Sequence, residues 1–210
     1  ANGLTFSNVD GIAGSPFVID PSVISSLAGC RRGLGLENST SYITVRNLTL
    51  DNWGVAIGAN VTSNANLLFE DLDLSGEGPF FNGGDNRGLE LSGSNHIVRR
   101  IAITGRRRAF VASYLTNAVI QDLDISACAL GVQLENLAPT AVNPIVLSNI
   151  ATTDCDTGLY LYNVDGQSTL PWVIDPTVLT DLTGTSTPIQ LYGQSSWVTA
   201  DDGVLVEREV

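Results

Sequence analysis

The chain has 210 residues and carries 22 acidic against 10 basic side chains, a formal net charge of −12 at pH 7. All ten basic residues are Arg, which excludes Schiff-base catalysis and P-loop phosphate binding, because both need Lys. The negative field disfavours nucleic acid and anionic lipid and favours divalent cations. No apolar run approaches the ~20 residues of a membrane span. We therefore expect a secreted, extracellular or cell-surface protein whose leader has been removed, with no nucleic-acid partner and no membrane insertion.

An internal repeat organises the chain from about residue 33 onward. Its unit reads apolar-x-Asn/Asp-apolar-x-apolar, then a short polar turn, then Gly-apolar-x-apolar. Full copies lie at 45–50 with 54–57, 69–74 with 88–91, 98–103 with 109–112, and 120–125 with 131–134. A looser copy lies at 147–150 with 158–161, and outer half-copies lie at 33–36 and 188–191. A repeat of this length indicates a solenoid.

A column of Gly, or of Ala or Pro in its place, opens the second half of each unit. We place it at positions 33, 54, 88, 109, 131, 158 and 188, where the shortest separations are 21 and 22 residues. This is the length of one coil built from three short strands. Inward side chains of stacked coils then lie ~4.8 Å apart in apolar ladders such as Leu48–Leu72–Ile101–Leu123–Ile150. Gly in the column is expected to form a tight corner that a Cβ would crowd.

The repeat predicts an all-β fold, a right-handed parallel β-helix solenoid of about seven coils. A leucine-rich repeat is disfavoured, because its Asn signature and helical segment are missing. We assign residues 1–210 to one β-helix domain, with an N-terminal lead-in or cap at 1–16, coils at 17–197, and a terminal strand or cap at 198–210.

The segment 87–98, which reads RGLELSGSNHIV, is the clearest copy of the pattern. It resembles the pectate-lyase-like superfamily of right-handed β-helices, including NosD-like and polysaccharide-lyase-like repeats. The resemblance covers roughly residues 17–197. It implies the fold and leaves the activity open, because such repeats occur in lyases, hydrolases, epimerases, adhesins and structural proteins.

The two ends of the predicted solenoid carry one motif twice. Residues 16–29 and 171–184 are identical at eight of fourteen positions. Either both segments are terminal coils with a shared cap, or their similar ends stack between subunits. A solenoid end exposes an unpaired sheet edge, and a head-to-tail contact would propagate as a filament. The second reading makes another copy of the chain a partner.

The largest insertion, residues 75–86, is a Gly-rich arm with two adjacent aromatics that we expect beside the Arg-rich turn at 105–108. Aromatic faces combined with Arg and carboxylates suit an anionic polysaccharide. The candidate ligand-binding residues are Phe80, Phe81, Asp85, Arg87, Glu90, Arg106, Arg107 and Arg108. In the alternative, the two phenylalanines cover the flank of the solenoid and the arginines pair with nearby acids.

A uronate lyase would also need a base and a cation that neutralises the sugar carboxylate. The candidate Ca²⁺ ligands are Asp71, Asp73, Asp122 and Asp124, with Arg99, Arg100 or Arg106 as base or carboxylate clamp. In the alternative, the Asn/Asp column is a turn-bonding ladder and no cofactor is bound. The column runs through Asn47, Asp71, Arg100, Asp122 and Asn149.

Two cysteines and the single histidine complete the candidates. Cys128 and Cys155 each stand three residues before a column Gly, so they stack in neighbouring coils and form either a disulfide or a ladder of small side chains. Cys30 is several coils away. His96 stands at a corner, where an imidazole is expected to be exposed or hydrogen-bonded.

These patterns predict an extracellular, non-catalytic β-helix, a structural or surface-interaction module that self-assembles end to end and contacts polysaccharide. The alternative is a polysaccharide lyase or epimerase acting on uronate polymers.

Overall fold

The computed structural model describes residues 2–24, 27, 30–51, 54–76, 86–137, 144–164, 172–174, 178–193, 195, 198–200 and 206–208. These residues form strands and turns, and every ladder between named strands is parallel. Within this part of the chain, no helix is long and apolar enough to cross a membrane.

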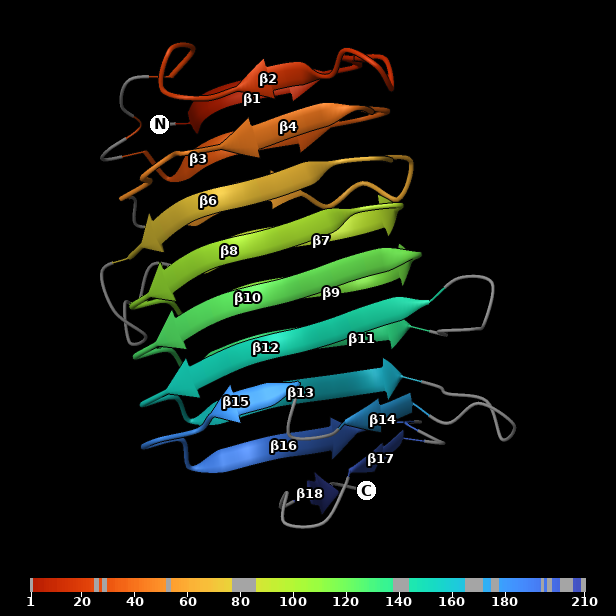
Figure 1. Ribbon diagram of the computed structural model, residues 1–210. Helices are drawn as coiled ribbons and strands as arrows, with labels where there is room; N and C mark the ends of the chain where they lie inside the picture. Colours follow the sequence, from red (N-terminus) through yellow and green to blue (C-terminus); the bar gives the residue numbers. More distant parts are fainter. Residues whose placement is uncertain are drawn as a thin grey trace.

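Two facing sheets build most of the described part of the molecule (Figure 1). Sheet 1 consists of β1 (Asn2–Ser7), β3 (Arg32–Glu37), β5 (Val55–Ala59), β7 (Arg87–Ser94), β9 (Arg108–Thr116), β11 (Leu130–Leu137), β13 (Thr157–Val164), β16 (Thr187–Tyr192) and β18 (Val206–Arg208). Sheet 2 consists of β2 (Phe17–Ile19), β4 (Ile43–Arg46), β6 (Leu68–Ser75), β8 (Ile97–Thr104), β10 (Ala118–Ser126), β12 (Ile145–Thr153) and β15 (Leu179–Asp181). The chain alternates between the two sheets, so neighbouring strands in each sheet come from successive coils. This is the predicted parallel β-helix.

A sharp bend divides the strands of sheet 2, so each coil has three extended segments. The bend falls on the Asn/Asp column, where Asn47, Asp71, Arg100, Asp122 and Asn149 all have a left-handed backbone with φ between 52° and 56°. Asn and Asp tolerate this conformation better than other non-Gly residues, which explains the column. The column is thus a ladder at a turn, but its described side chains bond to one another, as in the 2.6 Å contact from Asn149 Nδ2 to Asp122 Oδ1, where backbone N–H donors were expected.

The apolar ladders fill the space between the two sheets. The registers place Leu72, Ile101, Leu123 and Ile150 directly above one another, and all four are buried. A facing ladder from sheet 1 contains Leu34, Ile57, Leu89, Phe110, Val132, Leu159 and Ile189. At ~1.5–3 kcal/mol for each buried aliphatic side chain, these ladders are the main stabilising term.

The small-residue column is real, but one of its predicted members is wrong. Because Ile57 pairs with both Leu34 and Leu89, the column residue of β5 is Ala56, and Gly54 lies outside the column. A Cβ added to Gly33 or Gly88 would lie 2.6 Å or 2.5 Å from the carbonyl oxygen of the next column residue. The crowding comes from the neighbouring coil, so the column marks close stacking of coils and not a corner of the backbone.

The two ends differ from the expected arrangement. β1 pairs with β3 in sheet 1, so the stack already includes the segment predicted as a lead-in. The repeated motif occupies unlike places, because β2 pairs with β4 in sheet 2 whereas β14 (Trp172–Ile174) pairs with β17 (Val198–Ala200) in a separate small sheet. Similar sequence at the two ends therefore does not give equivalent strands.

Candidate interaction surface on sheet 1

In-register rows of side chains run across sheet 1, one at the start of its strands and one that alternates with the buried ladder. One row contains Arg32, Val55, Arg87, Arg108, Leu130, Thr157 and Thr187. The next row contains Thr5, Gly35, Gly58, Glu90, Val111, Gln133, Tyr160 and Gln190. The surface of sheet 1 thus has two chemically different halves. The earlier coils carry arginines and the later coils carry tyrosines.

The basic half is built from ion pairs. Arg32 Nη1 lies 2.7 Å from Glu37 Oε1, and Arg87 bonds to Glu90 within the same strand. Arg108 is the register partner of Arg87 and is half-buried. Arg87, Glu90 and Arg108 therefore lie on two adjoining strands of sheet 1, β7 and β9. Ligand binding by these residues stays a prediction.

The tyrosine half holds three near-parallel rings from two adjacent coils. The Tyr162 and Tyr192 rings stack with centroids 5.6 Å apart and an interplanar angle of 21°, and Tyr160 lies 6.4 Å from Tyr192 at 24°. Tyr192 is 39% exposed. An aromatic ring has an apolar body and a polar tip, so this tyrosine cluster (residues 160, 162 and 192) suits a ligand with both apolar and hydroxyl groups.

A buried amide lies one strand away from the tyrosine cluster. Gln133 is the register partner of both Val111 and Tyr160, and it is only 4% exposed. Its Nε2 donates to Glu135 Oε1, and Glu135 Oε2 lies 3.5 Å from Ser113 Oγ. Gln133 Oε1 has no hydrogen-bond partner among the described residues. An unpaired acceptor at this depth is uncommon in proteins.

Comparison with known proteins agrees with this architecture. A family model described as a right-handed beta helix region matches residues 32–196. The chain belongs to the right-handed beta helix family. Searches of curated proteins and of solved structures gave no significant match. The family establishes the fold and its hand, and the chemistry must be argued from the side chains.

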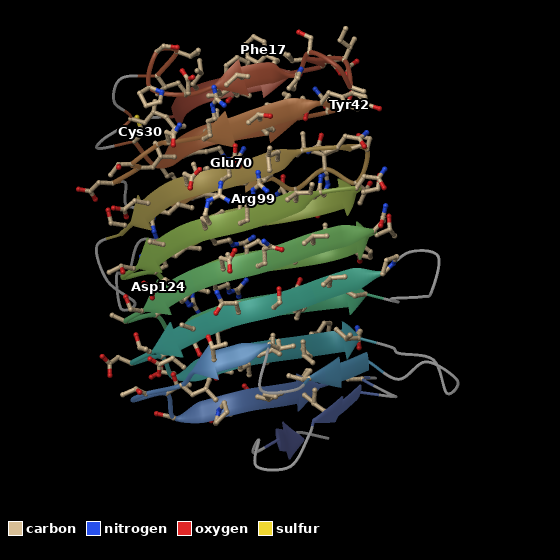
Figure 2. The ribbon with its side chains drawn as sticks, in the orientation of Figure 1. Phe17, Cys30, Tyr42, Glu70, Arg99 and Asp124 are labelled. Carbon is tan, nitrogen blue, oxygen red and sulfur yellow. The ribbon has the colours of Figure 1, made fainter. Side chains whose placement is uncertain are left out.

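On sheet 2 of the right-handed β-helix, the arginines proposed as base or clamp are held by carboxylates. Figure 2 shows Glu70 and Arg99 facing each other on the outer surface, where Glu70 Oε2 lies 2.7 Å from Arg99 Nη2 and 2.9 Å from Arg100 Nη2. Arg100 also binds both oxygens of Asp71. This hydrogen bonding lowers the pKa of Asp71 and raises the pKa of Arg100. Both groups are therefore held in their charged forms.

The four aspartates proposed as Ca²⁺ ligands are not brought to one point. Asp73 and Asp124 are each the register partner of Ala102, on opposite sides of it, so a whole coil separates them. Asp71 binds Arg100, and Asp122 accepts from Asn149. Among the described residues, no group of three or more His, Cys, Asp and Glu side chains could hold a metal ion. Ca²⁺ binding stays a prediction that these positions do not support.

Arg106 is not a surface ligand residue of this β-helix, so that prediction is corrected. Its side chain is fully buried and turns inward, where it donates to the carbonyl oxygens of Leu74, Gly54 and Ser75 and to Asn86 Oδ1. Burial lowers the pKa of Arg106 to about 10, so it stays charged at neutral pH.

These contacts give Arg106 a structural role at the base of the arm. Ser75 and Asn86 are the two ends of the insertion, so the arm does begin and end beside the 105–108 turn, as expected. Arg107 is exposed. Phe80, Phe81 and Asp85 lie outside the described residues, so their predicted role is untested.

His96 is buried and fully hydrogen-bonded, which is the second of the two expected environments. Its Nδ1 accepts from the Leu67 backbone N–H at 3.2 Å, so Nε2 carries the proton and donates to the Ser92 carbonyl oxygen at 3.1 Å. Burial lowers the pKa of His96 to about 4. The ring therefore joins coils as a neutral structural group.

Cys128 and Cys155 stack in neighbouring coils as predicted, and both are buried with free thiols. The Asp156 backbone N–H donates to the Cys128 carbonyl oxygen at 3.2 Å, and the Arg106 N–H approaches Cys128 Sγ at 3.4 Å. The hydrogen bond with Cys155 and burial raise the pKa of the Cys128 thiol. In this structure the two cysteines form the predicted ladder of small side chains. A disulfide between them under oxidising conditions stays a prediction.

Sequence reasoning missed Gln133, Tyr160, Tyr162 and Tyr192. The usable signal was the x position of Gly-apolar-x-apolar, which points outward in every coil and becomes Gln133 and then Tyr160 in successive units. Arg106 could also have been placed from the repeat, because it occupies the position that Cys128 and Cys155 fill in the next two coils.

Proposed function

We propose that this right-handed β-helix is a non-catalytic, extracellular surface-interaction module that holds a carbohydrate polymer along the outer face of sheet 1. The observation that carries the proposal is the tyrosine cluster one strand from Gln133, whose buried amide oxygen has no partner among the described residues. Protein sites for ligands of this kind combine aromatic surface with a few fixed polar groups.

The alternative function, cleavage or epimerisation of a uronate, needs a base that reaches the sugar proton. The candidate bases are otherwise engaged. His96 is buried and neutral, Arg106 is bound to carbonyl oxygens inside the turn, and Arg100 is held by carboxylates. This supports binding without chemistry.

The test joins a binding and a cleavage assay on the same samples. The protein is incubated with pectate and alginate, with and without Ca²⁺, and the absorbance of unsaturated uronate is followed. Migration through gels that contain a neutral polysaccharide, pectate or alginate is recorded in parallel. We expect retarded migration in at least one polymer and no rise in absorbance, whereas a steady rise would overturn the non-catalytic proposal.

A second candidate function, association between copies, is favoured by the β1–β2 end of the stack. Ile12 is 66% exposed there, and the Phe6 and Phe17 rings pack 5.5 Å apart; they belong to β1 and β2, the last strands of the two sheets in the described part of the chain. The occupant would be a terminal strand of a second copy, because an unpaired parallel strand recruits another strand.

Light scattering over a wide concentration range tests this association. We expect the mass to grow with concentration in the unmodified protein and to fall in an Ile12→Ser variant. The control is Val146→Ser, because Val146 is 45% exposed on the side of sheet 2. A single monomer mass for the unmodified protein at all concentrations would refute it.

A further inference from the structure

The amide of Gln133 has a fixed orientation and an unused acceptor. Its Nε2 faces the Glu135 carboxylate, which can only accept, so the amide oxygen must point the other way. That oxygen is buried and has no donor among the described residues. A buried acceptor without a donor destabilises the folded protein. Because the oxygen has almost no exposed surface, a ligand hydroxyl supplies the missing donor only when a neighbouring side chain moves aside.

The tyrosine cluster supplies the second half of the same site. Tyr160 is the register partner of Gln133, and Tyr162 is the register partner of Glu135, so both rings lie one coil away from the amide and its carboxylate. Tyr192 extends the cluster by a further coil. A sugar ring matches this arrangement, because its C–H groups pack on aromatic carbon while its hydroxyls donate to the amide and the carboxylate.

The charge around the site disfavours an acidic sugar. No Arg, Lys or His occurs between residues 109 and 207, and this stretch holds eleven Asp and Glu. Glu135 lies in the site itself, half-buried beside Gln133. A uronate or sulfate group there would face the carboxylate of Glu135 at short range, which is unfavourable wherever short-range interactions are unscreened. The arginines of the adjoining strands, Arg108 on β9 and Arg208 on β18, pair in register with Leu130 and Leu191 and not with Gln133 or Glu135.

We infer that Gln133, Glu135 and the tyrosine cluster form a binding site for a neutral saccharide. The inference rests on the proposed function and names its ligand class, and it departs from the uronate expected from the arginines of the earlier coils. Gln133 Oε1 accepts from a sugar hydroxyl, Glu135 accepts from a second hydroxyl, and the tyrosines pack against the ring.

The test uses affinity gels that contain hydroxyethylcellulose, galactomannan or laminarin as neutral probes, with pectate and alginate as acidic ones. Gln133→Met removes the acceptor and Tyr162→Leu removes one ring of the cluster. Matched controls are Gln121→Met on the outer face of sheet 2 and Tyr114→Leu, an exposed tyrosine outside the cluster. Urea unfolding is measured for all four variants.

We expect retardation by a neutral polymer, weakened roughly tenfold by each site variant, as for loss of one well-made hydrogen bond or contact, and unchanged in both controls. Gln133→Met should fold at least as stably as the unmodified protein, because it removes an unpaired buried oxygen. A purely structural glutamine would instead lower stability in that variant.

The outcomes separate the two proposals. Retardation by pectate or alginate alone, or equal binding by the site variants and the controls, would overturn the neutral-sugar site and leave the proposed function standing. Binding to none of the five polymers would overturn both.

Discussion

The sharpest consequence of the structure concerns the only histidine. The His96 ring accepts from the Leu67 N–H and donates to the Ser92 carbonyl oxygen, and it is almost completely buried. A second ring proton would have no acceptor, because the Leu67 N–H already occupies Nδ1. Protonation therefore requires the ring to leave this position, and burial lowers its pKa to about 4 from an ordinary 6.5.

The sign and size of the effect follow from linkage. The unfolded chain takes up the proton near pH 6.5 while the folded protein resists it until about pH 4, so the unfolded state gains stability across that window as the pH falls. A shift of about 2.5 units corresponds to about 3 kcal/mol at roughly 1.4 kcal/mol per unit. The folded protein has lost this full contribution to its free energy of unfolding below about pH 4, and it keeps all of it above about pH 7.

Two measurements separate the contribution of His96 from that of the carboxylates, which titrate in a similar pH range. The first compares urea unfolding of the unmodified protein and a His96→Gln variant from pH 7.5 to pH 3.5. The free-energy advantage of the unmodified protein should fall by about 3 kcal/mol over this range. The second follows the imidazole signal by NMR, which is unambiguous because the chain has one histidine. An imidazole that titrates between pH 6 and 7 in the folded protein would refute the reasoning.

Three further predictions concern the buried interior. Arg106→Met should lower the free energy of unfolding by about 3 kcal/mol, because several carbonyl oxygens lose their donor. Arg107→Met, at the exposed neighbour, should change it by less than about 0.5 kcal/mol. Equal losses for the two variants in urea titrations would contradict the structural role of Arg106. Leu123→Asp should abolish folding by placing an unpaired charge in the central ladder, and an unchanged thermal transition would reject that ladder. Thiol titration should find Cys128 and Cys155 unreactive in the native protein and three thiols in denaturant, while a single thiol in denaturant would establish a disulfide between the stacked pair.

The repeat was sufficient to predict the solenoid, because each coil must place its apolar residues on the same ladder. Leu72, Ile101 and Leu123 stack as expected since one inward position in each unit is always a large aliphatic. The error at Gly54 has a simple cause. Two small residues, Gly54 and Ala56, stand two positions apart with the same inward–outward phase, and only the neighbouring strands decide which joins the column.

The side-chain chemistry could be predicted only in part. Residue types indicated that Arg106 and Arg107 share a turn, but one points into the core and the other into solvent, which depends on the carbonyl oxygens that the turn encloses. Likewise the carboxylates of Asp73 and Asp124 are separated by a coil whose residue at that position is Ala102. A site assembled across coils depends on the register, which spacing alone does not fix when insertions vary in length.

The central claim is that the tyrosine end of sheet 1 binds carbohydrate without cleaving it. The most direct measurement is migration of the unmodified protein and its Gln133→Met variant through gels of neutral polysaccharide, with the polymer length determined before and after incubation. The account predicts retardation of the unmodified protein, weaker retardation of the variant, and unchanged polymer length. Equal migration of both proteins at the rate seen in plain gels, or a shortened polymer, would contradict it.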